Sequence, residues 1–245
     1  MSSAVRMAVA SEPAREQRFG EAVVARLALF RGVSAPDLAA INRQCALQQA
    51  RAGEVIARRG YRLPGLFAVA SGTVKLSLRG GEHGERVVRL VSAGETFGEA
   101  TALLGKPSRY EARALADARL VVIPTAAIAA LMEHDARFSR GLVMSMAARE
   151  LELAAELEAA TVLGGAERLA AYLKSLCDGG GDASKTVQLP VSKTVVAARL
   201  GIKKETLSRL LRQLTTEGLI KVSNREISIL DRARLFDMAR GEAAK

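Results

Sequence analysis

The stretch that decides the fold lies near the C-terminal end of the chain and reads Val-Ser-Lys-Thr-Val-Val-Ala-Ala-Arg-Leu-Gly-Ile-Lys-Lys-Glu-Thr-Leu-Ser-Arg-Leu-Leu-Arg-Gln-Leu over residues 191–214. Ser192 is of a type preferred at helix N-caps, and the apolar residues after it predict a short helix with one apolar face. Gly201 then suits a left-handed stop, because glycine lacks the Cβ that penalises positive φ. A second helix is predicted over residues 203–217, where leucines recur at helical spacing.

Two short helices joined by a glycine turn form a helix-turn-helix, whose second helix can lie in the major groove of DNA. That role requires a polar or basic face, and Lys204, Arg209 and Arg212 lie off the leucine stripe. Two alternating stretches, residues 219–223 and 226–229, predict a hairpin that would be the wing of a winged helix. The alternative interpretation is a small helical domain whose basic face is merely solvated.

The composition favours a globular chain with a polyanionic partner. The chain has 245 residues, of which 49% are hydrophobic and 25% charged, which allows one or two domains with a real core. The net charge is +10, and residues 191–225 contain eight lysines and arginines against two glutamates. Positive charge clustered in this way contacts phosphate by releasing counterions. A membrane-surface role is disfavoured, because the sequence shows no long amphipathic lysine helix.

The two cysteines, Cys45 and Cys177, form no C-x-x-C pair, and the N-terminal region has no cysteine cluster. We therefore expect this chain to hold neither an iron–sulfur cluster nor a zinc site. The default interpretation is two buried free thiols, with a redox switch as the alternative. Residues 1–17 lack the apolar core of a secretory signal, and no apolar run approaches the roughly 18 residues of a spanning helix. These features predict a cytoplasmic protein.

The N-terminal half changes from helical to β-type signals. Residues 1–18 are predicted to be a mobile tail, followed by a helix over residues 19–29 and, after the N-cap residue Ser34, a second helix over residues 35–45. Between residues 47 and 123, short β-rich stretches alternate with glycines, which indicates a small sandwich or barrel. Strands are predicted over residues 54–57, 65–70, 73–78, 86–90, 111–116 and 119–123, and further helices over residues 125–132 and 166–176.

Two motifs in this half resemble parts of a known family. Residues 70–76 read Ala-Ser-Gly-Thr-Val-Lys-Leu and residues 93–100 read Ala-Gly-Glu-Thr-Phe-Gly-Glu-Ala, which together with the spaced glycines resemble the cyclic-nucleotide-binding β-roll. With the helix-turn-helix after them, the chain resembles the CRP/FNR family of bacterial transcription regulators over nearly all of residues 19–229. The resemblance implies an α+β fold in four parts. These are a flexible tail (1–18), a double-stranded β-roll sensor domain (19–132), a dimerisation helix (133–163) and a winged helix-turn-helix DNA-binding domain (164–245).

One long helical pattern without proline runs over residues 136–163, before a glycine pair that is the expected hinge, Gly164 and Gly165. Its apolar residues fall close to a coiled-coil seam, which is interrupted at Arg149 and Glu156. The family places this helix at its two-fold axis, so the resemblance implies a homodimer. The alternative is a core helix packed on the β-roll. The candidate dimer interface consists of Leu142, Met146, Leu153, Leu157 and Ala160.

The predicted second helix carries Glu-Thr-Leu-Ser-Arg at residues 205–209, which is similar to the Glu-x-x-Ser-Arg pattern of the FNR side of the family. This chemistry suits base reading, because an arginine can donate two hydrogen bonds to guanine O6 and N7 and a carboxylate can accept one from cytosine N4. By resemblance, the DNA site is an inverted repeat with a TTGAT-like half-site. The candidate base-reading residues are Glu205, Ser208 and Arg209, and the candidate phosphate-binding residues are Ser192, Lys203, Lys204 and Arg212.

The candidate effector pocket departs from the cyclic-AMP branch of the family. In that branch, Gly-Glu is followed about ten residues later by Pro-Arg-Ser, whose Arg and Ser bind the cyclic phosphate. This chain keeps the Gly-Glu pair and the proline, but then has Ser108 followed by Arg109. In an extended segment, a displacement of one residue turns a side chain to the other face. The candidate pocket residues are Gly98, Glu99, Ser108 and Arg109.

Further observations bear on the effector, whose identity stays open. The positions that match the adenine-binding hydroxyls of the cyclic-AMP branch are Leu153 and Ala154, which are apolar. Cyclic AMP is therefore disfavoured. Haem is the next idea, because some relatives sense gases, but His83 at a glycine-rich hairpin tip and His134 at a helix start are each expected to be surface histidines. Cys45 could serve as a thiolate ligand, although nothing else in the sequence supports that role.

The leading function hypothesis is a dimeric, sequence-specific DNA-binding transcription regulator. Its β-roll would sense an effector that shifts the population of two dimer states, and RNA polymerase is a partner by resemblance only. The alternative hypothesis is a cyclic-nucleotide-responsive signalling adaptor whose C-terminal domain binds protein, against which the basic recognition face argues. An enzyme is not expected, because the sequence lacks a nucleophile elbow, P-loop, zinc motif and histidine-based triad.

Overall fold

The computed structural model describes residues 20–79, 84–178 and 186–241. The chain divides into two compact units, one formed by residues 1–76 and 90–148 and the other by residues 77–89 and 149–245. The division falls inside the long helix α5 (Ala136–Val162), so each unit contains part of that helix. The predicted tail at residues 1–18, the glycine run after α6 and the hairpin tip with His83 lie outside the described residues.

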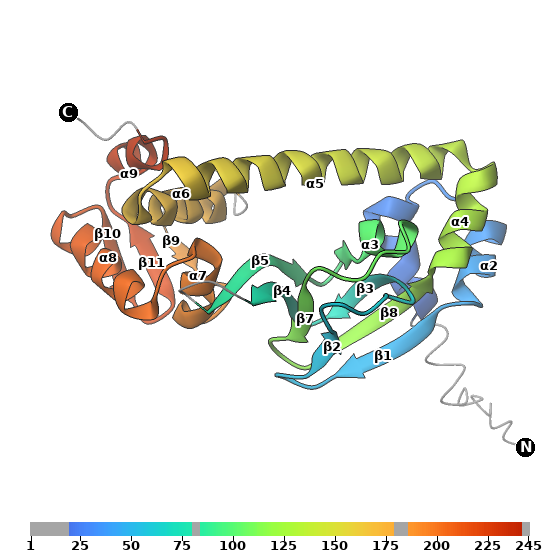
Figure 1. Ribbon diagram of the computed structural model, residues 1–245. Coiled ribbons are helices and arrows are strands. Elements are labelled where there is room, and N and C mark those ends of the chain that lie inside the picture. The colour runs from blue at the N-terminus through green and yellow to red at the C-terminus, as the bar shows by residue number, and fades with distance from the viewer. Residues whose placement is uncertain (1–19, 80–83, 179–185, 242–245) are drawn as a thin grey trace, which may run out of the picture. The chain divides into compact units, whose positions relative to one another are not determined.

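Residues 46–124 form two four-stranded sheets, as the alternation of short β-rich stretches and glycines predicts (Figure 1). The first sheet has the order β1-β8-β3-β6, with antiparallel pairing throughout. Its strands are β1 (Ala46–Ala50), β8 (Ala118–Pro124), β3 (Gly65–Ser71) and β6 (Thr96–Phe97). The second sheet has the order β2-β7-β4-β5, with strands β2 (Val55–Ala57), β7 (Glu111–Ala114), β4 (Thr73–Arg79) and β5 (Glu85–Ser92).

Helices cover one face of the first sheet. Leu66 of β3 and Ile123 of β8 belong to one buried cluster with helical side chains from both ends of the β region. Phe30 and Phe138 meet there with ring centroids 5.2 Å apart. Burial of such side chains contributes roughly 1.5–3 kcal/mol each. The helices that supply them are residues 20–26, η1 (Ala28–Phe30), α2 (Ala35–Asn42), α4 (Thr125–His134) and the first turns of α5.

The burial of Leu142 corrects the prediction that this residue lies in the dimer interface. Its side chain is 1% exposed and belongs, together with Phe138, to the core of its own chain. A side chain that is already buried offers no surface to a second protomer, so the core-helix alternative is right for the first two turns of α5. The later candidates are accessible. Met146, Leu153 and Leu157 are 36%, 47% and 66% exposed, and Ala160 is partly exposed.

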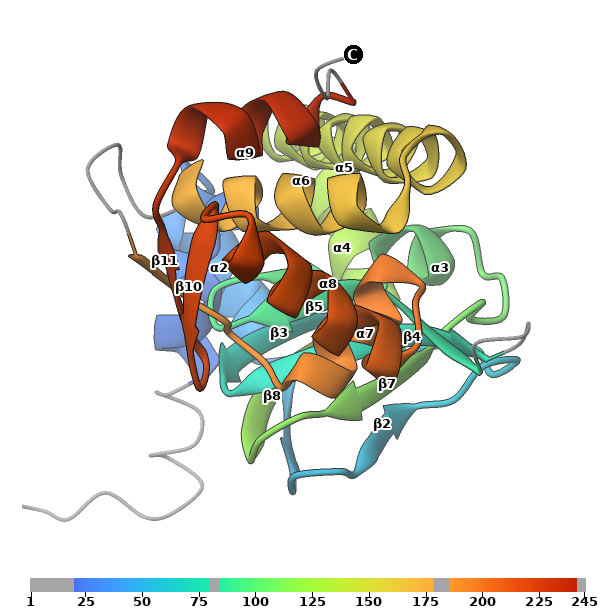
Figure 2. The same ribbon diagram turned by 90° about the vertical axis from the view of Figure 1, so that its left-hand side faces the viewer.

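The second unit contains a helical domain with a small sheet. Its three strands have the order β10-β11-β9, and helix α9 packs on helix α6 (Figure 2). Phe236 of α9 carries Arg232 on its ring face, 4.9 Å from the centroid, and Lys174 of α6 lies 5.5 Å away. The elements are α6 (Gly165–Asp178), β9 (Thr186–Gln188), α7 (Lys193–Leu200), α8 (Lys204–Thr216), β10 (Ile220–Ser223), β11 (Glu226–Ile229) and α9 (Arg232–Ala239).

Several helix boundaries differ from the sequence-based prediction, and two of them have a local cause. The helix predicted over residues 35–45 ends at Asn42, because Arg43 caps it and β1 begins at Ala46. His134 ends α4 and does not start a helix. The start of α5 is set instead by Asp135, whose Oδ1 accepts the backbone N–H groups of residues 137 and 138 at 2.9 and 3.0 Å. An aspartate in this position satisfies helix donors that have no partner within the helix.

Candidate nucleic-acid interface

Helix α7 begins and ends as the sequence predicts. The hydroxyl of Ser192 accepts a hydrogen bond from the backbone N–H of Val195 at 3.4 Å, which caps the helix. Gly201 ends the helix with φ of 67°, a left-handed conformation that a Cβ would penalise. The turn that follows is short, so α8 begins three residues later at Lys204, with Lys203 as its N-cap residue. These signals fix the helix-turn-helix locally.

Helix α8 separates its side chains into a buried stripe and an exposed polar face. Leu207 and Leu214 are 1% and 0% exposed, and Leu210 and Leu211 are also buried. On the other side, Lys204, Glu205, Ser208, Arg209 and Arg212 are all exposed, and these five side chains line one open cleft of about 530 Å³. The structure therefore brings together the predicted base-reading residues and two of the predicted phosphate-binding residues. The hydrogen-bond donors on this face can bind phosphates and the acceptor atoms of bases, and the carboxylate can accept a hydrogen bond from a base amino group.

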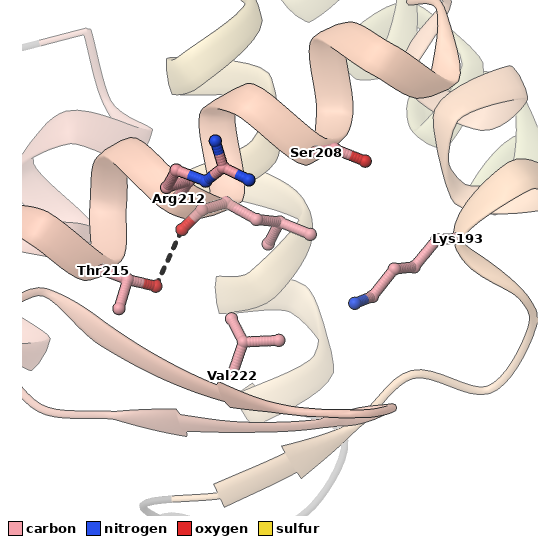
Figure 3. Close-up of a pocket in the computed structure, with 6 residues that line it drawn as sticks. Lys193, Ser208, Arg212, Thr215 and Val222 are labelled. Atoms are coloured by element: carbon pink, nitrogen blue, oxygen red, sulfur yellow. Dashed lines mark hydrogen bonds between the residues drawn. The ribbon is translucent and has the colours of Figure 1, made fainter.

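A second cleft, of about 230 Å³, lies between α7, α8 and the wing (Figure 3). Lys193 reaches toward it from the first turn of α7, Arg212 and Ser208 line it from α8, and Val222 lines it from β10. Thr215 also lines it, but its hydroxyl donates to the backbone carbonyl of Leu211 at 2.8 Å. The sequence-based prediction did not include Lys193 among the phosphate-binding residues. The position of Lys193 directly after the N-cap Ser192 was the signal that could have identified it. A residue in the first turn of α7 can bring its ammonium group to the cleft between α7, α8 and the wing.

Ser208 is held differently from its neighbours on the recognition face. Its hydroxyl donates to the backbone carbonyl of Lys204 at 3.1 Å, a bond to the preceding turn that helical serines commonly make. The hydroxyl oxygen still has lone pairs for an incoming donor. Ser208 can therefore accept a hydrogen bond from DNA without losing its bond to the helix.

The wing is a hairpin whose turn is stabilised from outside the hairpin. Asn224 has φ of 56°, the left-handed conformation that two-residue hairpin turns need. The guanidinium group of Arg225 donates to the carbonyl of Leu189 through Nη2 at 2.8 Å and through Nε at 3.2 Å. Strand β9, which the sequence did not reveal, pairs with β11 and adds a third strand. The position of the wing beside α8 is thereby fixed by the segment that precedes α7.

The candidate effector residues are arranged around helix α3 (Glu99–Leu103). Gly98 precedes this helix with φ of 94°, and a Cβ there would lie 3.0 Å from Leu63. Ser108 is 2% exposed, and its hydroxyl donates to the carbonyl of Tyr110 at 2.8 Å. Arg109 is exposed. The inward position therefore holds a small hydroxyl already engaged with its own backbone, and the guanidinium group lies on the other side of the segment.

The two cysteines and the described histidine have environments that bear on a cofactor. Burial raises the pKa of the Cys45 thiol to about 11 and also raises the pKa of Cys177. The thiolate is the form that binds a metal or attacks a disulfide, so both thiols are poorly disposed to either role at neutral pH. His134 is bonded through both ring nitrogens, to the Ala130 carbonyl at 2.8 Å and to Asp37 at 3.0 Å. Among the described residues, no group of three or more His, Cys, Asp or Glu side chains is placed to hold a metal ion.

No helix within the described ranges is both long and apolar enough to cross a membrane. The long helix α5 has charged side chains along its length, including an ion pair between Arg149 and Glu152 at 2.7 Å.

Comparison with known proteins agrees with this architecture. Residues 47–135 match the cyclic nucleotide-binding domain family, and residues 167–238 match the Crp-like helix-turn-helix domain family. The transcriptional regulator SdrP of Thermus thermophilus is 30% identical over 194 residues, which cover 77% of this chain and 92% of that protein. The cyclic AMP receptor protein of the same organism is 29% identical over 78% of this chain and 87% of that protein.

Solved structures and a shorter match complete the comparison. A transcriptional regulator of the CRP/FNR family from Thermus thermophilus, TTHA1359, is 26% identical with a TM-score of 0.62, over 80% of this chain and 98% of that one. FixK2 from Bradyrhizobium japonicum, 24% identical with a TM-score of 0.68 over 79% of this chain and 96% of that one, shares the fold. A protein described as a potassium channel from Rhodopseudomonas palustris is 30% identical over 118 residues, and the chain spans only 28% of its length.

A β domain of the cyclic nucleotide-binding type followed by a Crp-like helix-turn-helix defines a class of proteins that regulate transcription. The chain belongs to the CRP/FNR family of DNA-binding transcription regulators.

Proposed function

We propose that the protein binds an inverted-repeat site in duplex DNA as a homodimer, with Glu205, Ser208 and Arg209 reading bases. The observation that carries this proposal is the exposed polar face of α8 above its buried leucines. In a helix-turn-helix, the second helix lies in the major groove, where an arginine and a carboxylate can read guanine and cytosine. Ser192, Lys203, Lys204 and Arg212 would hold phosphates around it, and Lys193 joins them from the second cleft.

A homodimer is supported by the exposed apolar side chains in the later turns of α5. Met146, Leu153 and Leu157 recur at spacings of seven and four residues, which places them on one face of the helix. Apolar side chains that project into solvent from a regular helix are stabilised when a second helix covers them. A two-fold dimer would present two copies of α8 to two half-sites about one helical turn of DNA apart. RNA polymerase is the protein that such a DNA-bound dimer would contact.

The β-roll would sense an effector that does not rely on an arginine clamp for a cyclic phosphate. The burial of Ser108 and the exposure of Arg109 support this proposal, because the buried position of this segment carries a hydroxyl and no guanidinium group. Haem has no evident ligand among the described residues, and the raised pKa of Cys45 argues against a thiolate there. Calorimetric titration with cyclic AMP tests the inference. Binding at micromolar concentration would contradict it.

The DNA-binding proposal is tested by selection of sites from a random duplex library, followed by mobility-shift titration at several salt concentrations. We expect an enriched inverted repeat and an affinity that falls steeply with salt, because the phosphate contacts release counterions. An enriched half-site without symmetry would contradict the dimer alone. Binding that shows no preference among sequences would contradict base reading by α8. If no DNA binds at any salt concentration, the C-terminal domain recognises something else.

A further inference from the structure

Two arginines meet at one carboxylate in the second compact unit. Glu156 of α5 accepts a hydrogen bond from Arg199 of α7 at 3.1 Å and another from Arg149 of its own helix at 3.5 Å. Arg149 and Arg199 also donate to the backbone carbonyl of Val88 in β5, each at 3.3 Å. All four residues belong to the second unit. One carboxylate and one carbonyl thus join α5, α7 and β5.

Two further arginines add positive charge at the same place. Arg86 of β5 packs so closely on Gly201 that a Cβ at the glycine would collide with Nη1 of the arginine. Burial lowers the pKa of Arg86, and so do the positive charges of Arg168 and Arg199, whereas Glu156 acts in the opposite direction. Within the described ranges, Arg86 makes no hydrogen bond. We call these four residues the arginine cluster: Arg86, Arg149, Arg168 and Arg199.

Two buried polar atoms of α6 beside the cluster have no hydrogen-bond partner. Arg168 donates through Nη1 to the carbonyls of Ala160 and Leu163 at 3.2 and 3.1 Å, but its Nε is buried and unpaired. The hydroxyl of Tyr172, one turn later on the same face of α6, is also buried and unpaired. Burial raises the pKa of Tyr172, and the positive charge of nearby Arg199 partly offsets that rise. Buried polar groups without a partner are rare, because they are costly.

The charges in the arginine cluster are not balanced. Of the described residues whose charges act on Arg86, two are arginines and one, Glu156, is an acid. Guanidinium groups bind phosphate oxygens through paired hydrogen bonds, so the cluster favours a phosphate-bearing anion. The side chains of Arg149 and Arg199 are only 24% and 26% exposed, which keeps them from the backbone of a rigid duplex. The fitting ligand is therefore a small molecule.

We propose that the arginine cluster binds a phosphorylated small molecule, whose phosphate groups lie among Arg86, Arg168 and Arg199. The hydroxyl of Tyr172 donates to the same anion. The anion offsets the repulsion between the arginines and thereby stabilises the contacts that join α7 to α5 and β5. Because α7 is the first helix of the helix-turn-helix, the ligand and DNA would influence each other's affinity reciprocally. None of these residues belongs to the candidate effector pocket, so the cluster is a second ligand site.

The test measures binding of pyrophosphate to the full chain by calorimetric titration, with thermal melting in the absence and presence of pyrophosphate. Arg86→Met removes the guanidinium group and keeps an unbranched apolar stem. This variant should melt no lower than the wild type without pyrophosphate, because it relieves repulsion and breaks no hydrogen bond. Arg234→Met, at an exposed arginine of α9 in the same unit, is the control with the same change in net charge. Tyr172→Phe removes only the hydroxyl.

We expect pyrophosphate to bind the wild type and Arg234→Met alike, and to bind Arg86→Met about tenfold more weakly, because a charge-assisted contact is lost. Tyr172→Phe should bind more weakly by a smaller factor and should melt no lower than the wild type without pyrophosphate. Equal affinity of Arg86→Met and Arg234→Met overturns the proposal. So does a wild type that binds no pyrophosphate at millimolar concentration.

Three further outcomes would also contradict the proposal. If Arg209→Ala loses pyrophosphate affinity and Arg86→Met does not, the anion binds on α8. If Arg86→Met weakens only binding to duplex DNA, the cluster contacts DNA phosphates. If citrate binds as tightly as pyrophosphate, the cluster attracts anions without recognising phosphate. The pyrophosphate titration contains no DNA, so its result does not depend on whether the proposed DNA site is right.

Discussion

His134 at the end of α4 and Asp37 in α2 form an ion pair, with 3.0 Å between Nε2 and Oδ1. The same carboxylate accepts the hydroxyl of Ser34 at 2.7 Å, and the other ring nitrogen of His134 meets the carbonyl of Ala130 at 2.8 Å. The hydrogen bond to Asp37 is the main reason that the pKa of His134 is raised above 6.5. Hydrogen bonds from Ser34 and His134 lower the pKa of Asp37 below 3.8. The pair joins two helices that are distant in the sequence.

The ion pair predicts a pH-dependent part of the stability. Because the pKa of His134 is raised in the folded protein, its contribution to stability is fully present below the unfolded pKa of 6.5. That contribution is lost as the pH rises through the folded pKa. A lowered aspartate pKa stabilises the fold above 3.8 and ceases to do so as the pH falls through the folded value. The difference in melting temperature between the wild-type protein and His134→Gln should therefore be largest between about pH 4 and 6.5. A difference that persists undiminished at pH 9 would show that charge is not its source.

Arg209→Ala should weaken binding to the preferred DNA site by about 1–3 kcal/mol and relax the preference at one base pair. The reason is that an arginine reading guanine through two hydrogen bonds contributes to discrimination as well as affinity. The measurement is mobility-shift titration against the selected site and its single-base variants. Arg234→Ala, an exposed arginine of α9, is the control. An equal loss on every sequence would mean that Arg209 touches only phosphate.

Lys193→Ala should weaken binding about equally on all sequences and reduce the salt slope by about one. Lys193 lines the cleft between α7, α8 and the wing, where a phosphate rather than a base edge is the expected ligand. Titrations at four or more salt concentrations provide the slope. A change of base preference without a change of slope would assign Lys193 to base reading instead.

Leu157→Asp should dissociate the proposed dimer, because it places a charge in the apolar face that the later turns of α5 present. Sedimentation velocity at micromolar concentration measures the oligomeric state. Leu151→Asp is the matched control, since Leu151 and Leu157 are 69% and 66% exposed and lie about 120° apart around the helix. We expect the control to remain dimeric. Dissociation by Leu151→Asp with a dimeric Leu157→Asp would place the interface on the face of α5 that carries Leu151.

Leu142→Ala should behave as a core substitution and cost roughly 2–5 kcal/mol of unfolding free energy. Its side chain is 1% exposed within the cluster that also holds Phe138. Urea denaturation monitored by circular dichroism gives the value. Any change in self-association should follow from unfolding alone, so at low temperature the folded fraction should retain the wild-type oligomeric state. A stable fold that fails to dimerise would return Leu142 to the interface.

The helix-turn-helix could be predicted almost to the residue because its signals are local. The hydroxyl of Ser192, the missing Cβ of Gly201 and the four leucines of α8 each act within one or two helical turns. Two of the elements that were missed depend on distant partners. Strand β1 exists because β8 pairs with it, and β9 because β11 does. Helix α3 is five residues long, too short for a periodic pattern to show.

The candidate site was predictable in part for the same reason. Exposure of Arg209 follows from the phase of the leucine stripe within one helix. Lys193 required knowledge that the wing strand β10 stands across a cleft from α7, which no local pattern contains. Leu142 was misplaced because a heptad spacing cannot distinguish a side chain that faces its own core from one that faces a second chain. The sequence indicated that a displacement of one residue can turn a side chain to the other face, and the structure has Ser108 buried and Arg109 exposed.

The amino-acid sequence of α5 should diverge among related chains at one rate in its first turns and at another in its later turns. Phe138 and Leu142 are confined by a close-packed core, so replacements there must keep apolar volume. In the proposed dimer, the residues after them contact a second protomer, and the identical copy always carries the same substitution. A substitution at Leu153 or Leu157 is therefore made twice at once, opposite itself. Descendants of one ancestor can drift apart along these turns until their protomers no longer mix, which separates duplicated regulators within one cell.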